Sequence, residues 1–137
     1  MVIRKQALGL LIVFGLSGCT HLQKAGTNED LDHAVDTYWK AVHWQDAVAG
    51  AAFVYFDQRA EWLRTRDKRS RDLNVTTWDV QGEKVDPGEK TATVLVKATW
   101  FLLPSSIEQT DVVEQRWIYK DGHWEVIAEK GGPLPFP

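Results

Sequence analysis

The sequence predicts an α+β domain in which helices come first and an antiparallel sheet follows. Apolar residues recur at helical spacing between residues 31 and 66, alternate with polar residues from residue 73 onward, and are separated there by turn residues. The chain has 137 residues, is 44% hydrophobic and 26% charged, and carries a net charge of −3. These values suit one globular domain and argue against a general nucleic-acid binder.

The first 18 residues have the composition of a signal peptide. Arg4 and Lys5 give a positive start, and the apolar run at residues 7–16 is too short to span a bilayer. The run ends in Leu16-Ser17-Gly18-Cys19, which resembles the bacterial lipoprotein lipobox. The resemblance implies lipid transfer to the Cys19 sulfur, cleavage before Cys19 and acylation of the new amine. An ordinary secretory signal with a chance cysteine is the alternative.

Residues 19–26 are then expected to be a short lipidated tether, and residues 27–137 the domain. Thr20 follows the cysteine in place of the Asp that favours inner-membrane retention, so the resemblance implies an outer-membrane protein that faces the periplasm. A lone cysteine leaves no internal disulfide framework. We expect the lipid on Cys19 to hold the protein on the membrane, and we expect no cofactor.

The first predicted helix begins at a Thr27 cap and runs to His43. Asp36 and Lys40 lie one turn apart on its polar side, in the favourable order. The apolar positions lie three and four residues apart and form one face. They are Leu31, Ala34, Val35, Tyr38, Trp39, Ala41 and Val42.

Asp46 is expected to cap a second helix that runs from Ala47 to about Asp57. Its residues are rich in Ala and apolar nearly all round, which predicts a buried helix. Residues 58–66 either extend this helix or form a third, with Trp62 and Leu63 making its apolar contacts.

Four strands are expected after the helices, with Gly82 as a bulge or turn in the first. They are Leu73–Val85, Lys90–Leu103, Ile107–Lys120 and His123–Ala128. The turns between them are Asp86-Pro87-Gly88, Pro104-Ser105-Ser106 and Asp121-Gly122. The end of the chain, from Gly131, is expected to add no regular structure.

A two-residue hairpin loop at Asp121-Gly122 would set the register of the last two strands. Tyr119 then pairs with Trp124, and Trp117 with Val126. Since side chains alternate along a strand, Val113, Gln115 and Asp111 share the face of Trp117 and should point toward the helices. Glu125 should lie on the opposite, wetter face.

The order of these elements resembles the NTF2-like superfamily. Tyr38-Trp39-Lys40-Ala41-Val42 through Gln45-Asp46-Ala47 to Tyr55 is similar to its opening helices, and Lys120-Asp121-Gly122-His123-Trp124 to its last hairpin. The resemblance covers Leu31 to about Glu129. It implies a curved sheet wrapped around a helix, with a conical pocket, in a superfamily that holds both ketosteroid-isomerase-like enzymes and non-catalytic lipoproteins. An unrelated α+β sandwich is the alternative fold.

Three residues are candidates for acid–base catalysis on this resemblance. The isomerase branch uses a carboxylate base and a tyrosine donor, and here Tyr38, Asp57 and Asp111 supply those groups. Each also has a structural explanation: a core aromatic, a helix-end charge and a strand-end charge. The four histidines are scattered, so we expect no metal site.

Two further sets of residues are candidates for binding. The conical pocket would be lined by Tyr38, Val42, Trp100, Asp111, Gln115 and Trp117. The seven tryptophans of the chain would either line that pocket or fill it. Six cations within 13 residues form either an interaction patch or a solvated helix end. They are Arg59, Arg64, Arg66, Lys68, Arg69 and Arg71.

Two functions from different classes are compatible with the sequence. The first is a non-catalytic envelope lipoprotein whose domain binds an envelope protein partner or a small apolar ligand. The second is an isomerase- or lyase-like enzyme that uses acid–base chemistry in the pocket. An open pocket with converging acid–base groups would favour the enzyme, and an interior filled by tryptophan would favour the binding protein.

Overall fold

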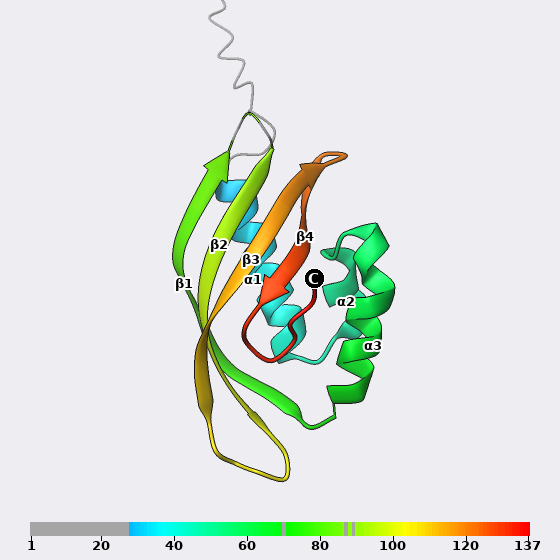
Figure 1. Cartoon of the computed structure of the whole chain (residues 1–137), viewed down its shortest axis with the longest axis vertical. Helices are drawn as coiled ribbons and strands as arrows, with labels where there is room; N and C mark the ends of the chain where they lie inside the picture. Colours follow the sequence, from blue (N-terminus) through cyan, green and yellow to red (C-terminus); the bar gives the residue numbers. More distant parts are fainter. Residues whose placement is uncertain (1–27, 70, 87, 89) are drawn as a thin grey trace, which may run out of the picture.

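Three α-helices precede a four-stranded antiparallel sheet, whose strands pair in chain order (Figure 1). The computed structural model describes residues 28–69, 71–86, 88 and 90–137. The elements are α1 (Asn28–His43), α2 (Ala47–Ala52), the 3₁₀ helix η1 (Phe56–Gln58), α3 (Arg59–Arg69), β1 (Leu73–Asp86), β2 (Thr91–Leu102), β3 (Gln109–Lys120) and β4 (His123–Lys130). The expected Thr27 cap and Cys19 tether lie outside the described residues.

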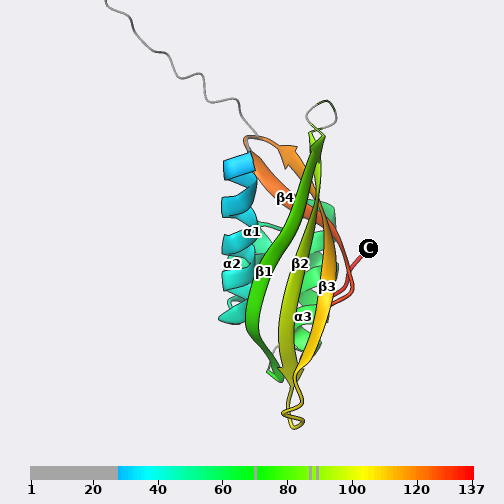
Figure 2. The ribbon, with the colours of Figure 1, turned by 90° about the vertical axis from the view of Figure 1, so that its left-hand side faces the viewer.

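Helix α1 lies across one face of the sheet and forms most of the core with it (Figure 2). All seven apolar positions predicted for its inner face are buried. The facing side of β2 is buried as well, at Ala92, Val94, Val96, Ala98 and Trp100. The apolar face of α1, with its 3.6-residue period, therefore packs on the apolar face of β2, with its two-residue period, as predicted.

Helix α2 is shorter than predicted. Its Asp46 cap is confirmed, since the carboxylate accepts a hydrogen bond from the Ala49 amide at 2.9 Å. The helix ends at Ala52 rather than Asp57 because the next residues pair with β4. The Val126 amide donates to the Phe53 carbonyl at 2.7 Å, and the Tyr55 amide donates to the Val126 carbonyl at 2.9 Å. Backbone hydrogen bonds to the edge strand β4 thus replace the additional helical turns that were predicted.

The prediction of a buried second helix from Ala47 to about Asp57 is therefore wrong. Val48 is 84% exposed and Phe56 is 73% exposed. The buried apolar residues of this region are Val54, which pairs with β4, and Trp62 on α3, which forms as a separate helix. Gly50 allows α2 to approach it, since a Cβ atom at that position would lie 2.6 Å from the Trp62 ring.

The predicted register of the last hairpin is confirmed. Tyr119 pairs with Trp124 and Trp117 with Val126. Asp121 and Gly122 have φ angles of 51° and 87°, as a two-residue loop of this kind requires. The expected irregularity at Gly82 is also present, because the β1–β2 register shifts between Val80 and Gly82.

A further bulge, in β4, changes which side chains point inward. Trp117 pairs with Val126 but the next residue back, Arg116, pairs with Ala128, so Ile127 is an extra residue. An extra residue moves every later side chain to the opposite face. Glu129 consequently points into the core and is only 2% exposed.

On β4, the sheet face opposite the core is less exposed to solvent than predicted. Glu125 is 7% exposed, and its carboxylate lies 2.7 Å from His123 Nε2 and 3.8 Å from an Arg59 nitrogen. The prediction of a solvated Glu125 is wrong because the segment between α2 and α3 packs alongside this strand.

The C-terminal segment crosses back over β4. Phe136 and Glu129 exchange backbone hydrogen bonds of 2.8 and 3.0 Å, and Leu134 and Phe136 are buried in the core. The prediction that the segment from Gly131 adds no regular structure is confirmed apart from this one bridge. Among the helices that the structure describes, none combines the length and the apolar character needed to cross a membrane.

Candidate functional site

A network of buried polar side chains lies at the centre of the domain, where the sequence analysis expected a pocket. The Tyr38 hydroxyl on α1 donates to Glu129 Oε2 on β4 at 3.1 Å. Gln115 Nε2 on β3 donates to the same oxygen at 2.8 Å. Trp62 Nε1 on α3 donates to the Tyr38 oxygen at 3.0 Å. All four residues are at most 2% exposed.

Two more tryptophans complete this network. The Gln115 side-chain oxygen accepts from Trp39 Nε1 at 3.4 Å and from Trp117 Nε1 at 3.3 Å. The Tyr38 ring packs edge-on against both indoles, with centroids 5.9 and 6.0 Å apart. Aromatic rings therefore occupy the interior, and the polar atoms between them have partners.

Burial sets the protonation of the two acidic groups in the network. It raises the pKa of Glu129 to about 7, although the hydrogen bonds from Gln115 and Tyr38 act in the opposite direction. Burial also raises the pKa of the Tyr38 hydroxyl well above its ordinary value, and the neighbouring Glu129 carboxylate adds to the rise. Tyr38 is thus a hydrogen-bond donor at neutral pH, and Glu129 changes protonation near neutrality.

The three candidate catalytic residues do not come together. Tyr38 is part of the buried network, whereas Asp57 is exposed in η1. Asp111 is exposed at the start of β3, where its carboxylate accepts from the Val112 and Gly132 amides at 2.9 and 3.1 Å. Asp111 therefore does not reach the interior as expected. The pairing of β4 with β3 stops at Glu114, and the Asp111 carboxylate turns to the backbone of Gly132.

The other five residues predicted to line the pocket are buried. Tyr38, Val42, Trp100, Gln115 and Trp117 are 0–6% exposed and fill the interior with one another and their neighbours. Glu129, the only carboxylate of the network among the described residues, was not one of the predicted site residues. No sequence signal marked it, because the β4 bulge that turns it inward contains neither Gly nor Pro.

A groove at the end of α1 carries a large exposed aromatic side chain. Trp44 is 76% exposed and packs edge-on against the His43 ring, at a centroid distance of 4.8 Å. The groove has a volume of about 480 Å³ and is lined by His43, Trp44, Gln45, Asn74, Val75, Thr76 and Phe101.

This groove runs along the outer edge of β1. The His43 ring nitrogen Nδ1 lies 2.5 Å from the Val75 carbonyl oxygen, and Gln45 Nε2 donates to the Leu73 carbonyl at 2.6 Å. Both carbonyls lie on the first strand of the sheet, which has no neighbouring strand on that side. Side chains thus cover the edge and hold Trp44 outward.

The six predicted patch cations do not form one surface. Arg59 donates to the Val54 carbonyl at 2.8 Å, Arg69 donates to the Pro133 carbonyl at 3.0 Å, and Arg64 pairs with Glu61. Arg66 is not part of the predicted surface patch, because its side chain is only 2% exposed. Lys68 and Arg71 are exposed. Nowhere in the described part of the chain do three His, Cys, Asp or Glu side chains gather as they would around a metal ion.

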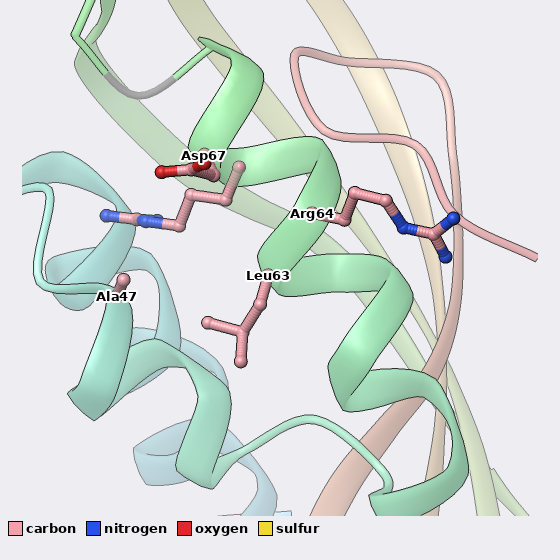
Figure 3. A pocket seen from close by; sticks show the side chains of 5 residues that line it. Ala47, Leu63, Arg64 and Asp67 are labelled. Carbon is pink, nitrogen blue, oxygen red and sulfur yellow. The ribbon is translucent and has the colours of Figure 1, made fainter.

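Arg66 instead lines a cavity between α2 and α3, of about 460 Å³ (Figure 3). Its other lining residues are Ala47, Leu63, Arg64 and Asp67. Leu63 points from α3 into the space beside α2, near Ala47, whereas Arg64 extends from the other side of α3.

Comparison with known proteins defines the class of fold. No family model matches the chain, and no curated protein matches its sequence. Among solved structures, a SEC-C motif containing protein from Rhodopseudomonas palustris is similar, with a TM-score of 0.62, 12% identity, and 73% of this chain and 77% of that chain covered.

Two further structures name the fold. A ketosteroid isomerase-like protein from Erwinia carotovora atroseptica has a TM-score of 0.59 at 12% identity, covering 74% of this chain and 91% of that chain. An NTF2-like protein from Cytophaga hutchinsonii has a TM-score of 0.59 at 13% identity, covering 75% and 94%. The chain is an α+β domain with the NTF2-like fold, as predicted. At such identities the likeness concerns the fold and not the function.

Proposed function

We propose that this protein is an envelope lipoprotein whose NTF2-like domain binds another envelope protein and carries out no reaction in its interior. The observation that carries the proposal is the filled centre of the domain. Tyr38, Trp39, Trp62, Gln115 and Trp117 are each at most 1% exposed. A substrate would have to displace several aromatic rings to reach the Glu129 carboxyl, at a cost of several kcal/mol for each ring.

The surface supports a protein partner more than a small apolar ligand. Trp44 offers a large apolar surface at the groove along β1, with Phe101 beside it. Exposed tryptophans are enriched among the residues that dominate protein–protein binding energy. The hydrogen bonds of His43 and Gln45 to β1 hold this surface in place before binding, which lowers the entropy cost of association.

The membrane anchor is proposed from the sequence alone. Leu16-Ser17-Gly18-Cys19 supports lipid attachment at Cys19, and the short tether would keep the domain near the outer membrane, facing the periplasm. In the native host, we expect the wild type in the membrane fraction and labelled by fatty acid. Cys19→Ala should lose the label and become soluble in the periplasm. A Cys19→Ala variant that keeps its membrane association would contradict the anchor.

The binding surface is tested with a photo-crosslinking amino acid in intact cells. Placed at Trp44, it should give one discrete cross-linked protein. Placed at Val112, which is 51% exposed on β3, it serves as the matched control and should not give that product. The same product from both positions, or none from Trp44, would contradict this surface.

A further inference from the structure

Arg66 is a buried cation that the protein does not neutralise. It is 2% exposed, while its helix neighbours Arg64 and Lys68 are exposed. Among the residues that the structure describes, no carboxylate forms an ion pair with it. Buried arginines are rare, and nearly all are paired, because desolvating an uncompensated charge is costly.

The guanidinium of Arg66 uses few of its five donors. One terminal nitrogen donates to the Ala41 carbonyl near the end of α1, at 3.2 Å. The guanidinium carbon lies 5.1 Å from the centre of the Trp62 ring, which adds a cation–π contact. Nε is buried and has no hydrogen-bond partner. An unsatisfied buried donor of this kind is unfavourable until something accepts its hydrogen bond.

The electrostatic surroundings leave the charge in place. Burial lowers the pKa of Arg66, and the nearby Tyr38 and Asp46 partly restore it. An arginine keeps its proton under such conditions, because its ordinary pKa is so high. The Asp46 carboxylate is already engaged in capping α2 and makes no ion pair with Arg66.

The cavity beside Arg66 is open to solvent and large enough for a small ligand. Its volume of about 460 Å³ lies in the range of small-molecule pockets. Leu63 and Ala47 give it apolar walls (Figure 3), and Leu63 is 40% exposed although it is a large apolar residue. Asp67 lines the same cavity, so its carboxylate weakens the binding of any anion there and disfavours a multiply charged one most.

We propose that the cavity between α2 and α3 binds a small monocarboxylate with an apolar tail, whose carboxylate pairs with Arg66. A planar carboxylate matches the planar fork of a guanidinium and can accept two hydrogen bonds from it. The tail contacts Leu63 and Ala47. This site is separate from the Trp44 groove and does not depend on the proposed protein partner.

The test uses the ¹⁵N-labelled full chain in nonionic detergent, titrated with sodium isovalerate at constant ionic strength. We expect saturable NMR shifts at the amides of residues 63–67 and at the Arg66 Nε–H, with a dissociation constant in the millimolar range, about that of a weak fragment. Acetate should bind more weakly because it lacks the tail, and inorganic phosphate should not saturate. The absence of saturable shifts, or equal shifts with phosphate, would overturn the proposal.

Matched variants assign the effect to Arg66. Arg66→Met keeps the length and apolar stem, and should weaken isovalerate binding by more than about tenfold, the cost of a lost charged hydrogen bond. Lys68→Met removes an exposed cation from the same helix and should leave binding unchanged. Unaltered binding to a folded Arg66→Met protein would overturn the proposal.

A second variant covers the case in which Arg66→Met does not fold. Leu63→Asp places a carboxylate in the cavity at a partly exposed position, so the domain should still fold. It should abolish saturable binding through like-charge repulsion. Wild-type affinity in this variant would equally overturn the site.

Discussion

Glu129 and Arg66 are two buried ionisable side chains with different surroundings. Glu129 accepts hydrogen bonds from Tyr38 and Gln115, inside an interior filled by aromatic rings. Arg66 has a single carbonyl partner and a buried Nε without one, and it lines a cavity. Trp62 contacts both regions, because its indole nitrogen donates to Tyr38 and its ring lies under Arg66.

The difference separates a structural polar group from a candidate binding group. The hydrogen-bond donors around Glu129 are side chains of the protein itself, so its carboxyl group needs no ligand to satisfy it. Arg66 keeps a buried Nε donor without a partner and lines a cavity, and a buried unsatisfied donor gains most from an external acceptor. The same type of observation, a buried ionisable residue, thus supports opposite conclusions in the two regions.

The largest expected effect comes from removing the residue that the two regions share. Trp62→Ala should destabilise the domain by about 3–5 kcal/mol, since it creates a cavity and removes a donor from the Tyr38 oxygen. Urea denaturation followed by fluorescence of the other tryptophans measures it. A loss below about 1 kcal/mol would mean that the two regions do not depend on Trp62.

The next effect is a pH dependence that belongs to Glu129. Since its folded pKa is about 7 and its unfolded pKa is near 4.5, the folded state holds the proton more tightly between these values. Stability contributed by the neutral carboxyl is complete below about pH 4.5 and is lost as the pH rises to 7, by up to about 3 kcal/mol.

Glu129→Gln should remove this part of the pH dependence, because the amide is neutral throughout and its oxygen can still accept from Tyr38 and Gln115. We therefore expect the variant to be more stable than the wild type at pH 8 and similar at pH 4.5. The comparison isolates Glu129 from Glu83, whose pKa is also raised to about 7 by partial burial and by the nearby Asp32. Parallel stability curves for the two proteins would contradict the assignment.

A smaller effect, opposite in sign to that of Trp62→Ala, is expected at Arg66. In the absence of ligand, Arg66→Met should stabilise the domain by about 1 kcal/mol, because an uncompensated buried charge is replaced by an apolar side chain of similar length. Thermal unfolding of both proteins measures the difference. If the variant instead loses more than about 2 kcal/mol, Arg66 is a structural residue like Glu129, and the contrast between the regions disappears.

The smallest effect provides a surface reference. Asp36 and Lys40 form the predicted ion pair on the exposed side of α1. Asp36→Ala should cost no more than about 0.5 kcal/mol, and 1 M salt should reduce this further. A cost as large as that of a buried substitution would show that burial is not what separates these sites.

Local features of the fold could be predicted from the sequence with good accuracy. The apolar spacing from Leu31 to Val42 is enough to define the inner face of α1, because a helix repeats every 3.6 residues whatever surrounds it. The Asp121-Gly122 turn likewise sets the pairing of Trp117 with Val126, because a two-residue loop allows one register. Gln115 was correctly placed inward by the same alternation.

The candidate sites needed contacts between distant parts of the chain. Asp111 has the predicted parity, yet it is exposed, because strand alternation gives the face but not where the neighbouring strand β4 stops pairing. Arg66 belongs to a charged run that indicates a solvated helix, and it is buried only because α1 and α2 pack against that side of α3.

The sequence by itself determined the helices-then-meander order, the inner face of α1 and the last hairpin, since each depends on residues close together in the chain. The tertiary structure alone decided that α2 stops at Ala52 to pair with Val126, and that the β4 bulge turns Glu129 inward. Both are outcomes of competition between local propensity and long-range pairing. Such a competition is decided by the free energy of the whole packed domain and not by any short stretch of it.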